Sequence, residues 1–547
     1  MALFLILISV IIFTCVLLNN VSSKLGIPVL LFFIVLGILF GWGKTVFDTD
    51  RYWVVEDICS FALVFIMFYG GFGTSWNSAK PVVTESALLA TVGVAVTAGL
   101  TGLFCHFALG WQWVESLLMG SVVSSTDAAS VFSILRSRKL GLKNNTAPLL
   151  EMESGSNDPM SYMLTAVMIS VLQGTADGGQ VAWMIVAQIG FGALCGVLIA
   201  KGAQWVLGRI RFATAGFDSL FIFAVAIISY ALPSVIGGNG YLSAYIVGII
   251  LGNSDFSGRK PLVHFFDGIT SLMQVLIFFL LGLMAHPSSL HRAILPAGAI
   301  ILFMMVVARP FAVGAVLTPF NRSKRFRREG RRYSFRQQML ISFVGLRGAA
   351  SIVFAIMAVS AGAALEHDIF NIVFCIVLIS IAVQGSLIPK VADRLGMIDK
   401  DEDVMKTFND YSDGSHMAFG SIEVTASSRW NGCKVCQLGL PNNLLLVMVM
   451  RGEERIVPGG DTLLQEGDKV ITCSKAYENA TEANLVEHRL SRNSRWVGHR
   501  ISEYPNEQNR LVVLIRRGEE SIIPRGDTVL ERNDVLVLMN RDNPQNP

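Results

Sequence analysis

Residues 147–173 read APLLEMESGSNDPMSYMLTAVMISVLQ, an apolar segment of helical length with a polar cluster near its start. A membrane span needs about 20 mostly apolar residues, so this segment is long enough to cross a bilayer. Ionisable side chains inside a span are costly and by default mark an ion or proton path. On a helix, Ser154 and Asp158 are four residues apart and share a face, as do Glu153 and Asn157. The segment therefore predicts a buried polar site within a membrane helix.

The rest of the chain places this segment in a membrane protein. Of its 547 residues, 52% are hydrophobic and 16% are charged, and its mean hydropathy is +0.53. A soluble domain carries roughly a quarter charged residues. About half of the charged residues lie in 391–547, where they are mostly acidic, so we expect a membrane part followed by an aqueous tail. No basic stripe interleaves with aromatic residues, and nucleic acid is therefore excluded as a partner.

The apolar pattern predicts thirteen membrane spans. They lie near 2–19, 26–42, 55–73, 83–109, 112–135, 147–173, 181–206, 215–235, 239–252, 265–284, 293–320, 338–362 and 368–389. Loops that join odd spans to even ones hold nineteen Lys and Arg residues, whereas the opposite loops hold three. This bias predicts a protein of the plasma membrane whose N-terminus lies outside and whose tail lies in the cytoplasm. The basic cluster at 322–336 has two explanations: it binds anionic membrane lipid, or it is a cytoplasmic stop signal, which accounts for it at least as well.

Three more spans contain polar residues at mid-depth. The fifth carries Ser-Ser-Thr-Asp at 124–127, the eleventh carries Arg309-Pro310, and the twelfth carries Gly-Leu-Arg-Gly at 345–348. Paired discontinuous helices in corresponding halves indicate a transporter site built from inverted repeats. Broken helix ends offer backbone carbonyls to a cation, and Thr126, Ser154 and Asp158 supply further hard oxygen ligands.

The charges in these spans do not balance. Glu153, Asp127 and Asp158 face only two arginines, Arg309 and Arg347, so one carboxylate is left to take a proton or a cation. We expect Glu153 and Arg347 to form a structural ion pair. Arg309 is assigned equally to a structural role and to charge compensation. Asp127 is a further candidate for the cation- and proton-binding set, with capping of a half-helix or pairing with Arg309 as its alternatives. Asp158 is the predicted functional acid.

These motifs resemble the signature of cation:proton antiporters of the NhaP/NHE type. The resemblance rests on Thr126-Asp127, Glu153-Ser154, Asn157-Asp158, the 345–348 motif, and GYLSAYIVG at 240–248, and it covers about residues 1–390. It implies thirteen helices in dimerisation and core domains, usually in a homodimer. It also implies that Asp158 carries the exchanged ion with Ser154 and Thr126 as ligands and Asn157 beside them, and that Glu153 and Arg347 form a stabilising pair.

One departure from the family pattern concerns the third span. Many relatives have an acidic residue before a Gly-Gly pair, where this chain reads Phe-Tyr-Gly-Gly at 68–71, so an additional acidic contributor is in doubt. A buried carboxylate can hold either H⁺ or a monovalent cation, and competition for one site gives exchange. Because Asn157 stands beside Asp158 in place of a second acid, we predict electroneutral exchange of one proton for one cation.

The tail contains an internal duplication at an offset of 66 residues. Ser-Arg-Trp at 428–430 recurs at 494–496, and Arg-Gly-Glu-Glu at 451–454 recurs at 517–520. Alternating apolar runs between turn signals predict strands in two small α/β modules. The modules resemble the RCK/TrkA C-terminal regulatory domain, which dimerises and in some proteins binds a nucleotide such as cyclic di-AMP. Dimerisation alone and ligand sensing remain equal alternatives, and no GxGxxG fingerprint for a dinucleotide is present.

The sequence thus predicts an all-α polytopic membrane protein with a two-module tail. The predicted domains are an exchanger domain at 1–390, a linker at 391–418 and modules at 419–480 and 481–547. The predicted activity is K⁺/H⁺ antiport, with Na⁺/H⁺ next and a link to cell-volume control. A tail-gated cation channel is the alternative, although no TVGYG-like filter is present. A membrane enzyme that uses Asp127 and Asp158 is a weaker one.

The sequence predicts no resident cofactor and no metal site. The eight cysteines are scattered and show no disulfide framework. Cys433 and Cys436 form a CxxC pair, but no second pair stands at a spacing suitable for zinc.

Overall fold

A computed structural model of the chain gives the positions of most residues. It describes residues 9, 13–14, 29–41, 52–127, 130–131, 134–135, 140–209, 216–254, 259–285, 287–322, 332–362, 365–399, 417–426, 428–440, 444–452, 454–456, 458–475, 484–490, 496–503, 510–517, 520–522, 524, 527–532 and 534–540. The chain divides into two compact units, Met1–Ser412 and Asp413–Pro547. Each unit is considered separately.

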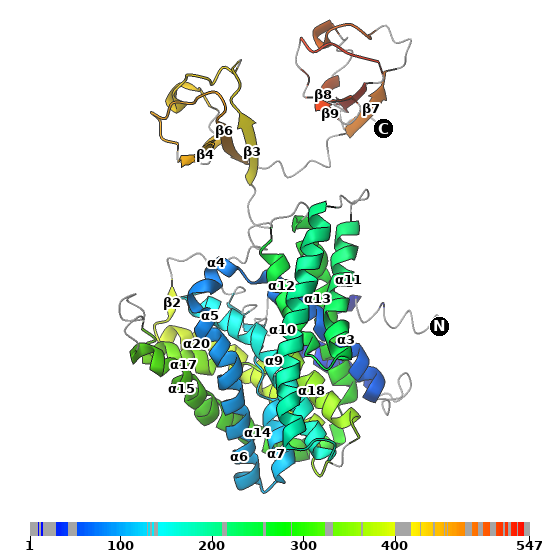
Figure 1. The fold of residues 1–547 in the computed structure, drawn as a ribbon, viewed down its shortest axis with the longest axis vertical. Helices are drawn as coiled ribbons and strands as arrows, with labels where there is room; N and C mark the ends of the chain where they lie inside the picture. The colour runs from blue at the N-terminus through cyan, green and yellow to red at the C-terminus, as the bar shows by residue number, and fades with distance from the viewer. Residues whose placement is uncertain are drawn as a thin grey trace. The chain divides into compact units, whose positions relative to one another are not determined.

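The first unit is almost entirely helical (Figure 1). Its described helices are α2 (Val29–Gly41), α3 (Tyr52–Gly73), α4 (Trp76–Ala79), α5 (Val83–Leu88), α6 (Val94–Leu109), α7 (Trp113–Val122), α9 (Thr146–Leu172), α10 (Gly178–Arg209), α11 (Phe217–Val235), α12 (Gly240–Gly252), α13 (Arg259–Met284), α14 (Pro287–Phe303), α15 (Arg309–Arg322), α17 (Phe335–Phe343), α18 (Ala349–Ser360), α19 (Ile369–Ile379) and α20 (Ser386–Arg394). Short 3₁₀ or π segments η1 (Lys80–Val82), η2 (Leu89–Gly93), η3 (Met304–Ala308) and η4 (Ser380–Gly385) continue neighbouring helices.

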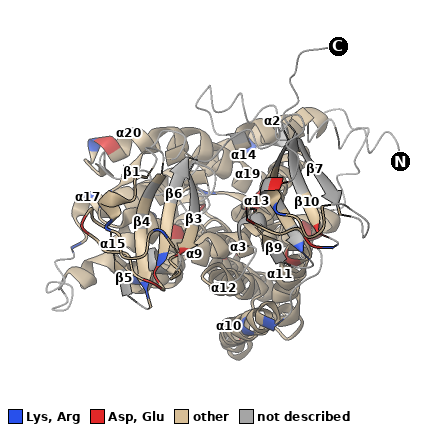
Figure 2. Ribbon diagram, turned by 90° about the horizontal axis from the view of Figure 1, so that it is seen from above, with Lys and Arg blue, Asp and Glu red and all other residues tan. Residues whose placement is uncertain are grey.

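Seven of the helical segments in the described residues are long and apolar enough to cross a membrane. They are Tyr52–Gly73, Lys80–Leu109, Gly178–Arg209, Phe217–Val235, Leu262–Met284, Leu290–Asn321 and Ile369–Arg394. The ribbon of the helical unit is mostly tan in Figure 2, where Lys and Arg are blue and Asp and Glu are red. The predicted spans from 26–42 onward all overlap described helices, although the span at 112–135 is helical in α7 and is described only in part beyond residue 127. The predicted span at 2–19 lies outside the described residues except for isolated positions. The total of thirteen stays a prediction.

Glycines allow α3 and α12 to pack backbone to backbone. A Cβ placed on Gly248 would lie 2.1 Å from the carbonyl oxygen of Phe68, and one on Gly71 would lie 2.3 Å from that of Tyr245. Small residues permit such close approach between membrane helices, where dispersion contacts replace the hydrophobic driving force. Gly71 of the third span therefore has a packing role, and it fixes α12 and its Tyr245 against α3.

Both predicted helix interruptions are present. After α7, residues 124–127 leave the helical conformation, and between α17 and α18 residues 345–348 do the same. The two interruptions meet, because the backbone N–H of Asp127 donates to the carbonyl oxygen of Leu346 at 2.8 Å. Gly348 makes this approach possible: a Cβ there would lie 2.3 Å from Oδ2 of Asp127. Backbone groups freed from two helices thus converge within the bundle.

The second unit contains two four-stranded antiparallel sheets of equivalent topology. The first has the order β3-β6-β4-β5 and the second has the order β7-β10-β8-β9. The strands are β3 (Met417–Glu423), β4 (Leu444–Arg451), β5 (Glu454–Ile456), β6 (Lys469–Lys475), β7 (Asn484–Arg489), β8 (Arg510–Arg517), β9 (Glu520–Ile522) and β10 (Val535–Asn540). The predicted α/β character is corrected here: in the described part of the modules, the helical segments are 3₁₀ turns at Val435–Gln437 and Ile501–Glu503. Glycines with positive φ at 432 and 439 are incompatible with a longer helix in the first module.

Each module contains the same ion pair, formed by a partly exposed arginine and a buried aspartate. In the first, Nε and Nη2 of Arg451 donate to the two carboxylate oxygens of Asp468 at 2.8 Å. In the second, Arg517 holds Asp534 in the same way, at 3.0 and 2.9 Å. Both aspartates are fully buried, so the pair clamps the end of β4 or β8 to the turn before the last strand of its module.

The clamp in the first module predicts a pH-dependent stability. The hydrogen bonds from Arg451 hold the pKa of the Asp468 carboxyl below its ordinary value. A group with a depressed folded-state pKa contributes stability above its unfolded pKa of about 3.9, and it loses that contribution as the pH falls through the folded value. We expect Asp468→Asn to cost about 2 kcal/mol at pH 7, because charge-assisted hydrogen bonds are lost. The difference between variant and wild type should narrow as the pH falls below about 3.9, and it should vanish only below the folded-state pKa.

Hydrogen exchange of the full-length protein in detergent measures this effect. Amides of β4 and β6 should exchange about 30-fold faster in Asp468→Asn at pH 7. The matched control is Asp461→Asn, because Asp461 is 94% exposed and pairs with Lys434 in solvent. Equal protection of β4 and β6 in wild type and Asp468→Asn would show that the clamp does not stabilise the module.

Candidate ion-binding site

Helix α9 carries the predicted acidic site into the interior of the helical unit. Glu153 is 1% exposed and Asp158 is 7% exposed, and Ser154 and Asn157 are buried with them. The side chain of Asn239, which caps α12, donates to the carbonyl oxygen of Pro159 at 2.8 Å. α9 is therefore held to α12 directly beside Asp158, which fixes the depth at which the acid lies.

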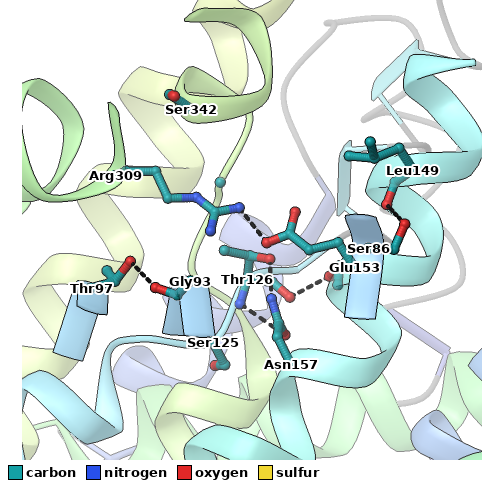
Figure 3. A network of polar contacts seen from close by, with 12 residues as sticks. Ser86, Gly93, Thr97, Ser125, Thr126, Leu149, Glu153, Asn157, Arg309 and Ser342 are labelled. Carbon is teal, nitrogen blue, oxygen red and sulfur yellow. Dashed lines mark hydrogen bonds and ion pairs between the residues drawn. The ribbon is translucent and has the colours of Figure 1, made fainter. Parts of the chain in front are cut away.

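Three predicted site residues join α9 to the interrupted fifth span (Figure 3). The amide of Asn157 donates to Oγ1 of Thr126 at 2.5 Å, and the backbone N–H of Thr126 donates to Oδ1 of Asn157 at 3.3 Å. The hydroxyl of Ser154 donates to the carbonyl oxygen of Thr126. Asn157 thus orients the Thr126 side chain, and Ser154 binds the backbone of the same residue at the interruption.

Asp158 has an unsatisfied carboxylate oxygen. Its Oδ1 atom is buried and has no hydrogen-bond partner among the described residues. A buried polar group without a partner is costly, and a buried charge is costlier still. The arrangement leaves this oxygen available to a proton or to a desolvated cation.

The predicted ion pair between Glu153 and Arg347 is wrong in this structure. Oε1 of Glu153 instead accepts from Nη2 of Arg309 at 2.5 Å, and both side chains are at most 2% exposed. Figure 3 shows the Arg309 guanidinium directed at this carboxylate. Arg309 therefore compensates the charge of Glu153, which was one of the two roles predicted for it.

Arg347 binds backbone carbonyls. Its Nη1 donates to the carbonyl oxygens of Ser124 and Ser125 at 3.0 and 2.5 Å, and its own N–H donates to Oγ of Ser380 at 3.0 Å. Arg347 binds these carbonyls and not Glu153 because the fifth span is interrupted at this point, and carbonyls at a broken helix end lack intrahelical donors. A guanidinium from the second interrupted span supplies them.

Asp127 makes the contacts of a helix cap, which was one of the roles predicted for it. Its Oδ1 accepts from the backbone N–H of Ser130 at 3.2 Å, and its Oδ2 accepts from the Ser130 hydroxyl. This is the geometry of an acidic residue that begins a helical turn.

A small cavity lies where the two interrupted spans cross. Its lining residues are Thr126, Asp127, Val131, Leu150, Glu153, Ser154, Arg309, Val344 and Gly345. Asp158 is not among them.

Sequence reasoning missed the polar brace behind this crossing. In η4, Ser380 donates to Oε1 of Gln384 at 3.0 Å, and the Gln384 amide donates to the carbonyl oxygen of Phe343 and, at 3.4 Å, to that of Gly345. These carbonyls lie at the end of α17, where the second interruption begins. A Ser and a Gln four residues apart in an otherwise apolar final span were the available signal.

The contacts of Arg347 predict the effect of its removal. We expect Arg347→Ala to lower the stability of the helical unit by about 2–3 kcal/mol, because two buried carbonyls lose their donor. The folded yield, measured by size-exclusion chromatography of detergent extracts, should fall. Arg292→Ala, at an exposed arginine of α14, is the control. A normal folded yield with lost transport would instead assign Arg347 to the exchange step.

Comparisons with known proteins agree with this architecture. Residues 8–394 match the family model described as "Sodium/hydrogen exchanger, transmembrane", and residues 420–476 and 485–543 each match the TrkA-C domain. The chain is 33% identical to the K(+)/H(+) antiporter NhaP2 of Shewanella oneidensis, over 86% of this chain and 80% of that protein. It is 37% identical to the K(+)/H(+) antiporter NhaP of Alkalimonas amylolytica, over 68% of this chain and 63% of that protein.

A solved structure has the same fold over the helical unit. The sodium proton antiporter MjNhaP1 of Methanocaldococcus jannaschii superposes with a TM-score of 0.61 at 22% identity, over 72% of this chain and 99% of that one. The family match covers most of the chain, including both interrupted spans and α9. The protein therefore belongs to the sodium/hydrogen exchanger family of cation:proton antiporters, with a tail of two TrkA-C domains.

Proposed function

We propose that this antiporter exchanges K⁺ for H⁺ in the first place, with Na⁺ as the next substrate, and that Asp158 carries either ion. The observation that carries the assignment to Asp158 is its unpartnered Oδ1 atom, buried in α9 where two interrupted spans converge. The preference for K⁺ is supported by the relatives whose names specify K(+)/H(+) antiport.

Competition at one carboxylate accounts for coupled exchange. With H⁺ or a monovalent cation bound, Asp158 is neutral, and the loaded site can change its access at low electrostatic cost. Without either ion, a bare carboxylate would have to move through a low-dielectric interior, which is strongly unfavourable. Thr126 and Ser154 supply hydroxyl oxygens to the cation, and Asn157 positions Thr126. One carboxylate that alternates between the two ions gives one-for-one, electroneutral exchange.

The proposed arrangement has thirteen spans, related as inverted repeats, in the plasma membrane, with the N-terminus outside. The strong bias of basic residues to one set of loops supports it. The tail would then lie in the cytoplasm and regulate a homodimeric exchanger, either by its own dimerisation or by binding a small nucleotide such as cyclic di-AMP. The family match to TrkA-C domains supports a regulatory tail.

A pairing within the helical unit gives such regulation a route. Strand β2 (Ile398–Asp399) pairs with β1 (Gly141–Leu142), and N–H of Lys143 donates to the carbonyl oxygen of Met397 at 3.0 Å. β2 is the last described element before the tail, and β1 directly precedes α9, which carries Asp158. A pull on β2 would therefore act on the start of α9.

Ion exchange in everted vesicles tests the proposal. A pH-sensitive dye should report H⁺ movement when K⁺ is added, at lower concentrations than for Na⁺ or Li⁺. The rate should be the same with and without thiocyanate, a permeant anion that collapses the membrane potential. A rate that depends on the potential would contradict electroneutral exchange, and a K⁺ current without proton counterflow would indicate the tail-gated channel.

A further inference from the structure

A second group of ionisable residues lies at the opposite end of the helical unit from β1 and β2. Glu115 is in the first turn of α7, and Glu366 and His367 precede α19. The C-terminal end of α9 reaches the same region, since the Gln173 amide donates to the carbonyl oxygen of Ala361 at 2.8 Å. One ligand atom from each of the three ionisable side chains lies within 4.8 Å of the other two.

The central carboxylate of this group is buried, and among the described residues its basic contact is His367. The Glu115 side chain is only 3% exposed. Its Oε1 accepts from the backbone N–H of His367 at 2.9 Å, and its Oε2 lies 3.1 Å from Nδ1 of the same residue. In the described part of the chain, no Lys or Arg pairs with Glu115 or Glu366. Within the described ranges, one imidazole is thus the only candidate counter-charge for the two carboxylates.

Neighbouring side chains hold this arrangement in place. The Trp111 ring stacks on the His367 ring with centroids 4.3 Å apart. The Gln112 amide donates to Oε1 of Glu366 at 2.5 Å, which orients the more exposed carboxylate. A binding site whose ligands are fixed before the ion arrives loses less entropy on binding.

We propose that Glu115, Glu366 and His367 bind one divalent transition-metal ion of the Zn²⁺ class. Zn²⁺ accepts both imidazole nitrogen and carboxylate oxygen as ligands, and water in the fourth position would complete a tetrahedral site around these three side chains. The ion neutralises the buried carboxylate and links the first turn of α7 to the loop before α19. In the proposed orientation, this end of the molecule faces outside, so the ion would come from the external medium.

Calorimetric titration of the full-length, untagged protein with Zn²⁺ in detergent tests the site. Every protein carries Cys433→Ser and Cys436→Ser, because these thiols are a competing zinc ligand pair. We expect about one Zn²⁺ per chain, and His367→Ala and Glu366→Gln should each weaken binding at least about 10-fold. His291→Ala, at an exposed histidine of α14, should bind as the parent does.

Two results would overturn the proposal. One is a parent protein that binds no Zn²⁺ up to about 100 μM. The other is a His367→Ala variant that binds it with unchanged affinity. His367→Ala keeps the backbone N–H that binds Glu115, and size-exclusion chromatography checks its folding. If it does not fold, Glu366→Gln decides alone, because Glu366 is exposed and the replacement keeps its shape.

Discussion

The Asp158→Asn protein is expected to fold normally and to exchange no cation for H⁺. The amide has nearly the same shape as the carboxylate, but it neither releases a proton nor carries the charge that binds a desolvated cation. Folding should survive, because Oδ1 of Asp158 accepts no hydrogen bond from the described residues that the replacement could break. Exchange in everted vesicles with K⁺ or Na⁺ should fall to the level of vesicles without the protein.

Two further variants make this result specific. Asp177→Asn replaces an exposed acid in the loop before α10 whose capping contact Asn can also make, so it should exchange as wild type does. Asp127→Asn should change stability by less than about 1 kcal/mol and retain exchange, because Asn caps a helix about as well as Asp does. If Asp158→Asn exchanged at the wild-type rate, the ion would have to bind elsewhere. If Asp127→Asn folded and were silent, the roles of the two acids would be reversed.

The membrane fold was largely predictable because its signals are local. Apolar runs of helical length marked the spans, and polar residues among glycines marked the interruptions at 124–127 and 345–348. The tail duplication was equally plain, since a constant offset of 66 residues carries the Arg451–Asp468 pair onto Arg517–Asp534. Each of these patterns lies within a short stretch or repeats without a gap, so no knowledge of long-range packing is needed to read it.

The partners within the site were not predictable in the same way. Two buried arginines have the same charge, and the sequence contains no distance that would assign Glu153 to Arg309 instead of Arg347. Arg347 instead donates to the backbone carbonyl oxygens of Ser124 and Ser125. These carbonyls lack intrahelical donors and come near Arg347 only in the folded protein, where the two interrupted spans cross. The group at Glu115 was missed because His367 lies 252 residues further along the chain.

Breaking the ion pair between Glu153 and Arg309 is expected to lower the stability of the helical unit strongly. Removing one partner, by Glu153→Leu or by Arg309→Met, should lower the free energy of unfolding by about 3–5 kcal/mol, because it leaves an uncompensated buried charge. The surroundings of the pair supply few other hydrogen bonds to the charge that would remain. Oε2 of Glu153 and Nε and Nη1 of Arg309 are buried and have no hydrogen-bond partner in the described structure. Thermal unfolding in detergent and folded yield measure the loss.

The double variant Glu153→Leu/Arg309→Met should recover most of this stability, because removing both charges of a buried pair is often neutral. Glu153→Leu/Arg347→Met should show no such recovery, since Arg347 serves the carbonyls of Ser124 and Ser125. Recovery in the second double variant instead of the first would restore the pairing predicted from sequence. If Glu153→Leu/Arg309→Met is stable and still exchanges K⁺ for H⁺, the pair has a structural role, and Asp158 is the residue that binds the transported ions. If it is stable and silent, the charges of the pair take part in transport.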